Sequence, residues 1–234
     1  MHDAPGTADR IDPPARAGIR RAADLRLRGR NGPIPVRVRW PASQALGSPP
    51  PVIVVLADPS GTSAAGPADD TLCDGLCAGL GALVLRASWA TRRDDAPDSA
   101  LERAGSALEW AADHAAELEG DPRRLIVAGR DKAAAAAGAL ALRARDNGWP
   151  RLEAQVLVLT RPCPEGEGTP PPARAGAPAA ATIVTPLAGS RCSQRLRAAG
   201  AEVTELVDSR VDPGEFPDQP YLAALTGALR ESLT

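Results

Sequence analysis

Residues 125–133 read LIVAGRDKA, an apolar run that ends at Gly129 and leads through a short turn into an alanine-rich segment. The continuous run Leu125–Gly129 is typical of a parallel strand that is buried on both faces of a sheet. The alanines of Lys132–Arg145 favour a helix, so the chain passes from strand to helix within a few residues. Strands that alternate with helices in this way are typical of α/β proteins.

The same alternation continues on both sides of this stretch. Two alternating segments near the start, Ala23–Arg28 and Ile34–Trp40, flank the turn residues Arg30–Pro33 and predict an antiparallel hairpin at a sheet edge. The remaining strands are predicted at Val52–Ala57, Ala82–Ala87, Leu152–Thr160, Ala181–Leu187 and Glu202–Val207, and the remaining helices at Ala68–Leu80, Pro97–Leu118, Ser193–Ala199 and Gln219–Ser232. The predicted fold is an eight-stranded, mostly parallel sheet with an antiparallel N-terminal edge and helices on both faces.

The composition excludes several classes of protein. Of the 234 residues, 44% are hydrophobic, which is too many for a disordered chain. The net charge of -2 argues against a nucleic-acid-binding protein. No apolar run reaches the roughly 18 residues of a membrane helix, and the first residues lack the apolar core of a secretion signal. We therefore expect neither nucleic acid nor a membrane as a partner.

The chain is expected to form a single domain with two irregular segments. Residues 1–20 are rich in Pro, Asp and Arg and predict a mobile N-terminal arm, which leaves residues 21–234 as the domain. Residues 161–180 contain six prolines, and proline disfavours a helix interior. This crossover between two strands is therefore expected to be a loop.

The four cysteines indicate no metal site. Cys73 and Cys77 are four residues apart in a predicted helix and share a face with leucines, so both are expected to be small core residues. Cys163 and Cys192 fall in polar loops and are expected to be free thiols. A zinc site would need two more ligands, which no nearby His or Cys supplies. Free thiols without an export signal predict a cytoplasmic protein, and we expect neither a metal nor a cofactor.

Four segments carry a resemblance to a known family: GPIPVRV (32–38), WAADHAAELEGDPRRLIVAG (110–129), RLEAQVL (151–157) and RLRAAG (195–200). In this order they resemble the α/β-hydrolase fold, and within it the esterases and lipases related to hormone-sensitive lipase. The resemblance covers about residues 30–233. It implies a catalytic Ser in a G-x-S-x-G elbow, a His, an acid, an oxyanion-hole loop and a cap. The short arm and the proline-rich segment 161–180 predict that the cap is largely absent.

At two of the implied catalytic positions, the chain carries aspartates instead. The elbow reads GRDKA (129–133), so Asp131 stands where the family has its Ser. The oxyanion-hole loop, H-G-G-G in the family, reads ADPS (57–60) and brings Asp58 to that position.

The other two catalytic groups of the family are missing. Residues 208–216, where the family has its His, contain Asp212 and no His. Residues 186–192, where the family has its acid, contain neither Asp nor Glu.

Neither histidine of the chain replaces the missing base. His114 falls in a predicted helix that resembles a surface helix of the family, and His2 lies in the arm. A nucleophilic Asp131 would form an ester intermediate, and no His is present to activate the water that breaks it. A simpler interpretation is that Asp131 tolerates the positive φ of the elbow and caps the following helix.

Three functions stay open at this point. The joint loss of Ser, His, acid and oxyanion glycines favours a non-hydrolytic binding or scaffolding protein without measurable esterase activity. The first alternative is a cyclase, isomerase or lyase in which Asp131 is a general acid or base. The second alternative is a residual hydrolase with a divergent site, using a serine such as Ser60 or Ser88.

The candidate site residues follow the strands of the predicted sheet, where open α/β sheets bind their ligands. The candidate catalytic residues are Asp58, Asp131 and Asp212, and the candidate binding residues are Ser60, Trp89, Arg130 and Lys132. If the three carboxylates converge, they form an acidic mouth that rejects anions and attracts a cation or an amine. The expected partner is a small molecule of that kind or another protein, and the sequence leaves a homodimer open.

Overall fold

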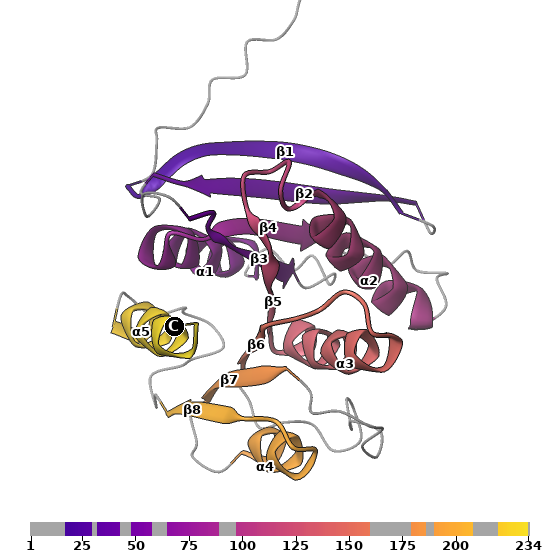
Figure 1. Ribbon diagram of the computed structural model, residues 1–234, viewed down its shortest axis with the longest axis vertical. Coiled ribbons are helices and arrows are strands. Elements are labelled where there is room, and N and C mark those ends of the chain that lie inside the picture. Colours follow the sequence, from indigo (N-terminus) through magenta and orange to yellow (C-terminus); the bar gives the residue numbers. More distant parts are fainter. Residues whose placement is uncertain are drawn as a thin grey trace, which may run out of the picture.

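The sheet has the predicted architecture. The computed structural model describes residues 17–29, 32–42, 48–57, 65–88, 97–159, 179–185, 190–207 and 220–233. Its eight strands pair in the order β1-β2-β4-β3-β5-β6-β7-β8 (Figure 1). Strand β2 is antiparallel to β1 and to β4, and the other neighbouring pairs are parallel. The predicted mostly parallel sheet with an antiparallel N-terminal edge is confirmed.

Strands and helices alternate along the chain after an N-terminal hairpin. The strands are β1 (Ile19–Gly29), β2 (Gly32–Pro41), β3 (Pro51–Ala57), β4 (Leu83–Ser88), β5 (Asp121–Arg130), β6 (Ala154–Val158), β7 (Ala180–Thr185) and β8 (Val203–Val207). The helices are α1 (Ala65–Leu80), α2 (Pro97–His114), α3 (Lys132–Asn147), α4 (Arg191–Ala198) and α5 (Pro220–Ser232).

Helices cover both faces of the sheet, with α2 and α3 on one face and α1 and α5 on the other (Figure 1). Strand β3 shows how one apolar run serves both cores. Its Val52, Val54 and Leu56 belong to the core under α2 and α3, whereas Ile53 and Val55 belong to the core under α1 and α5. Successive strand side chains point to opposite faces, so a strand covered on both sides is apolar throughout.

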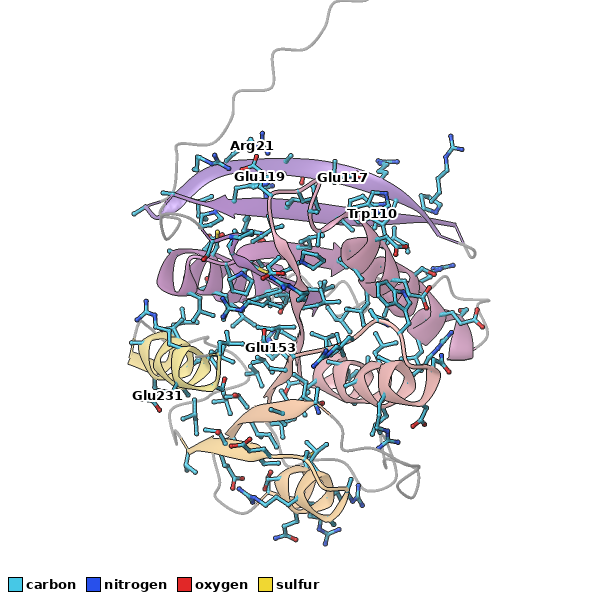
Figure 2. All side chains as sticks on the ribbon, in the orientation of Figure 1. Arg21, Trp110, Glu117, Glu119, Glu153 and Glu231 are labelled. Carbon is cyan, nitrogen blue, oxygen red and sulfur yellow. The ribbon has the colours of Figure 1, made fainter. Side chains whose placement is uncertain are left out.

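The N-terminal hairpin begins earlier than the sequence pattern indicates. Strand β1 starts at Ile19 rather than Ala23. Arg20 and Arg21, in the added part, form ion pairs with Glu119 in the turn after α2 (Figure 2). The Arg21 guanidinium also lies over the Trp40 ring, 3.9 Å from its centroid. Contacts with a distant turn thus hold residues that lack an alternating pattern of their own.

Helix α2 ends one turn earlier than predicted, at His114 instead of Leu118. The chain turns at Glu119, which adopts a positive φ of 69°. The Gly120 N–H donates to the Ala115 carbonyl at 2.8 Å across this turn. Leu118 still packs against the core. Its apolar character extended the helical spacing beyond the helix itself. Strand β6 is likewise shorter than the predicted Leu152–Thr160.

Two predicted irregular segments fall largely outside the described residues. Of the predicted arm, residues 1–16 lie outside them, and Ile19 and Arg20 are part of β1. Of the predicted loop 161–180, the structure describes only Ala179 and Ala180. The mobile arm and the missing cap therefore stay predictions. Within the described ranges, no helix is both long and apolar enough to span a membrane.

The cysteines divide into a confirmed pair and a corrected residue. Cys73 and Cys77 of α1 are fully buried, as predicted. Burial raises the pKa of each thiol to about 12. Cys192, the second residue of α4, is disulfide-bonded, so the prediction of a free thiol there is wrong. Spacing along the chain does not reveal which loops meet in the fold, and Cys163 lies outside the described residues.

Candidate functional site

The strongest candidate site is the turn between β5 and α3, where the elbow backbone is retained. Asp131 adopts φ 50° and ψ -112°, a conformation that non-glycine residues rarely adopt. Its N–H donates to the carbonyl of Val158 on β6 at 2.8 Å. Residues in such conformations persist where the surrounding structure enforces them, and they cluster at functional sites. The sequence prediction that Asp131 accepts a positive φ is confirmed.

Gly129 makes this sharp turn sterically possible. A Cβ on Gly129 would lie 2.8 Å from the Ala134 nitrogen and closer still to the Ala133 carbonyl. Both are backbone atoms of the first turn of α3, so no side-chain rotation would relieve the clash. The glycine of the G-x-S-x-G pattern therefore keeps its structural role in this chain.

The side chain of Asp131 does not cap α3, contrary to the interpretation made from the sequence. Asp131 occupies the N-cap position, but its carboxylate makes no capping hydrogen bond. Its carbonyl accepts a hydrogen bond from the Ala135 N–H at 3.2 Å. The N–H groups of Lys132, Ala133 and Ala134 belong to the first turn, which has no acceptors within the helix. A helix start of this kind favours negative charge.

The two neighbours of Asp131 point to different environments. Lys132 is exposed at the first position of α3. Arg130 is largely buried, and its Nε lies 3.5 Å from Oδ1 of Asp69, which is itself buried on α1. Arg130 was predicted to bind a ligand, and that role stays a prediction. The structure shows its ion pair with α1.

This ion pair belongs to a charged network that joins α1 to the sheet. Arg39 of β2 pairs with Asp70, and its Nε donates to Asp74 Oδ1 at 2.7 Å. Arg86 of β4 lies 3.9 Å from Asp70. The sequence analysis missed this network. The detectable signal was arginine in or directly after three predicted strands, matched by aspartates spaced along one helix.

The other candidate site residues cannot be placed beside Asp131. Asp58, Ser60, Trp89 and Asp212 lie outside the described residues, so the acidic mouth stays a prediction. Ser88 ends β4 and is partly buried.

His114 has a structural environment and lies away from the elbow. Its ring stacks on that of Trp110 of α2, with centroids 4.4 Å apart, and its Nδ1 lies 2.9 Å from the Trp110 carbonyl. Figure 2 labels Trp110. Helix α2 ends just before β5 begins, whereas Asp131 follows the end of β5. The two residues therefore lie toward opposite ends of β5.

Metal ligation finds no support in the described part of the chain. No group of three or more His, Cys, Asp or Glu side chains is gathered there in a way that could hold a metal ion.

Curated relatives of the chain carry names of ester hydrolases. Esterase LipI of Mycobacterium tuberculosis is 30% identical over 139 residues, which cover 58% of this chain and 43% of that protein. Carboxylesterase NlhH of the same organism is 32% identical over 125 residues, covering 53% of this chain and 38% of that protein. The matched part thus spans less than half the length of these relatives.

Solved structures show the same fold. An esterase of Pyrobaculum calidifontis superposes with a TM-score of 0.73 at 19% identity, covering 94% of this chain and 87% of that one. The carboxylesterase EstE1, cloned from a metagenomic library, gives a TM-score of 0.77 at 18% identity, with 94% and 91% coverage. At these identities, the likeness concerns the fold.

The favoured interpretation from the sequence, a non-hydrolytic binding or scaffolding protein, is contradicted by these relatives. They are named esterases and carboxylesterases and point to a hydrolase. That interpretation weighed the replaced residues alone, whereas the elbow backbone around them is retained. The comparisons lend no support to the cyclase, isomerase or lyase alternative. A sequence model of the alpha/beta hydrolase fold matches residues 60–204, more than half of the chain. The chain therefore belongs to the alpha/beta hydrolase fold family, in the branch of esterases and lipases related to hormone-sensitive lipase.

Proposed function

We propose that this protein is an ester hydrolase with a divergent site, in which Asp131 activates water. One observation carries the proposal. Asp131 keeps the strained elbow conformation at the end of the central strand β5, directly before the first turn of α3. The names of the relatives support hydrolysis as the reaction class.

A carboxylate at the elbow can catalyse ester hydrolysis without a covalent intermediate. The Asp131 carboxylate takes a proton from water, whose oxygen bonds to the ester carbonyl carbon. The bond to the leaving alcohol oxygen then breaks, and the proton passes from Asp131 to that oxygen. This route avoids an aspartyl ester, so it needs no histidine to break one.

The start of α3 supplies the charge stabilisation that this reaction needs. The carbonyl oxygen becomes negative when water adds, and backbone N–H groups at a helix start stabilise such an oxyanion. The Lys132 N–H directly follows Asp131 and belongs to the first turn of α3. It occupies the place in the chain that the family uses for one oxyanion donor.

The proposed substrate is a small ester. The predicted acidic residues Asp58 and Asp212 add a preference for a cationic or amine-bearing ester to the proposal. We also keep the cytoplasmic location in the proposal, although the bonded state of Cys192 removes the argument from free thiols.

The test compares Asp131→Asn with Asp113→Asn, which changes an exposed aspartate of α2. A general base typically contributes about 100-fold or more to a rate, so Asp131→Asn should lower kcat for p-nitrophenyl acetate by about that factor. Asp113→Asn should match the wild type. If wild-type hydrolysis does not exceed that of Asp131→Asn, the proposal fails.

Two further measurements separate the alternatives. Loss of activity in Ser88→Ala, with Asp131→Asn unaffected, would assign the hydrolysis to a serine instead. A kcat/KM for acetylthiocholine no higher than for its neutral isostere S-(3,3-dimethylbutyl) thioacetate would remove the proposed preference for cations.

A further inference from the structure

The residue on the N-terminal side of Asp131 is held by a buried ion pair that the proposed reaction does not use. The Arg130 side chain is 10% exposed and the Asp69 side chain 4%, with 3.5 Å between Arg130 Nε and Asp69 Oδ1. Burying two charges is expensive, so such a pair is weak evidence for stability by itself. A pair kept in this position therefore calls for another account.

Strand alternation explains why Arg130 reaches α1. Ile126 and Ala128 of β5 belong to the core under α1 and α5. Arg130 is two residues further along and points to the same face. Asp131 follows directly and has a φ of 50°. The ion pair of Arg130 with Asp69 therefore fixes the residue that directly precedes the strained one.

The strained residue is thus restrained from three directions. The Asp131 N–H donates to Val158 on β6. The missing Cβ at Gly129 lets the first turn of α3 approach. The third restraint is the Arg130–Asp69 pair, which connects the elbow to α1.

We infer that the Arg130–Asp69 ion pair is a positioning device that holds the elbow and sets the direction of the Asp131 side chain. This role rests on the proposed function insofar as it concerns catalysis, whereas the restraint on the backbone does not. Arg130 and Asp69 are positioning residues and do not touch the substrate in this account.

The rest of the network offers a matched control. Arg39 also pairs with aspartates of α1, and its side chain is 3% exposed. It lies on β2, which is separated from β5 by β4 and β3 in the sheet. Arg39→Met should therefore loosen α1 as Arg130→Met does, without changing the residue next to Asp131.

The first measurement is independent of activity. Hydrogen exchange followed by mass spectrometry reports backbone opening locally. In Arg130→Met, amides of residues 128–136 should exchange at least about tenfold faster relative to those of β3, whereas Arg39→Met should accelerate α1 and change 128–136 no more than β3. Equal rates at 128–136 in wild type and Arg130→Met would overturn the inference.

The second measurement is kinetic. A displacement of about 1 Å can cost about 100-fold in rate, so Arg130→Met should lower kcat for p-nitrophenyl acetate by up to that factor with KM nearly unchanged. In the folded enzyme, Arg39→Met should keep kcat within about twofold of wild type, because the residue next to Asp131 is unchanged. An equal loss of kcat in both variants would show that only docking of α1 matters and would overturn the inference.

A reversed pair keeps the test decisive if Arg130→Met folds poorly. The double variant Arg130→Asp with Asp69→Arg restores opposite charges, and it should recover slow exchange at 128–136 relative to either single variant. No recovery in a folded double variant counts against the inference. If wild type lacks hydrolysis but the exchange pattern holds, the proposed function fails and the positioning role stands.

Discussion

The two faces of the sheet are packed by different chemistry. Under α2 and α3, the core consists largely of alanine, leucine and valine, including Ala133, Ala137 and Leu140 of α3. Under α1, apolar packing is joined by ion pairs from three arginines on β2, β4 and β5. On the α2 and α3 face, the largely buried Arg145 side chain pairs with its own neighbour Asp146 on α3, whereas the arginines of the other face join the sheet to α1.

This difference matters because the elbow belongs to both faces. Gly129 faces α3, where small residues let the backbone approach closely. Arg130 faces α1, where charge selects its partner. Asp131 lies between the two, so its conformation depends on a steric requirement on one side and an electrostatic one on the other.

The largest effect is expected from breaking the steric requirement. In Gly129→Ala, the new Cβ collides with backbone atoms of Ala133 and Ala134. The free energy of unfolding should fall by at least about 4 kcal/mol, a value found for few single substitutions. Urea unfolding followed by circular dichroism measures it.

Gly138→Ala, in the helix α3 that Gly129 contacts, is the matched control. A Cβ there would meet only Gln155 Oε1, at an ordinary 3.8 Å. Alanine is the better helix former, so this variant should be more stable than wild type by about 0.5–1 kcal/mol. A Gly129→Ala variant as stable as Gly138→Ala would show that the elbow backbone relaxes freely.

The next largest loss of stability is expected when methionine is placed on the charged face, and it is compared with a methionine on the other face. Arg39→Met removes a buried guanidinium and strips Asp70 and Asp74 of that partner, which should cost about 3 kcal/mol. Leu108→Met, at a buried position of α2, should cost less than about 1.5 kcal/mol. Similar losses in the two variants would mean that charge adds no specificity on the α1 face.

The smallest effect tests how dry the α1 face is. Burial raises the pKa of Cys73 and Cys77 to about 12, so the folded thiols keep their protons while unfolded thiols ionise near pH 9. Stability from these groups is complete below pH 9 and is lost as pH rises toward 12. Between pH 9 and pH 10, the free energy of unfolding should fall by about 1 kcal/mol per thiol.

A variant with Cys73→Ala and Cys77→Ala isolates this loss. Its stability should change less over the same pH range, as measured by urea unfolding at each pH. The chain suits the measurement because only one lysine and one tyrosine have pKa values in the same pH range. Parallel pH curves for wild type and variant would show that water reaches the thiols.

The fold was predictable because continuous apolar runs mark strands that are covered on both faces. The run Val52–Ala57 gave β3 to within one residue. Boundaries failed where tertiary contacts decide them. The apolar periodicity continues to Leu118, although α2 ends at His114, before the turn at Glu119. No sequence pattern indicates that Arg20 and Arg21 extend β1 toward that turn.

The candidate site was predictable in position but not in environment. The glycine and the place of Asp131 between strand and helix located the elbow. Arg130 was expected to bind a ligand because it adjoins Asp131. The residues around it in the sequence give no sign of its ion pair with α1. Distance along the chain hid the pair, since Asp69 and Arg130 come together only when β5 and α1 pack in the folded sheet.

The exposed Lys132 offers a chemical handle beside the elbow. It is the only lysine of the chain, and it follows Asp131 directly. An amine-reactive fluorophore reacts with this side chain and with the α-amino group. The α-amino group has the lower pKa, so it can be blocked first at a lower pH. A dye attached there would report on the surroundings of the elbow in solution without the introduction of a new cysteine.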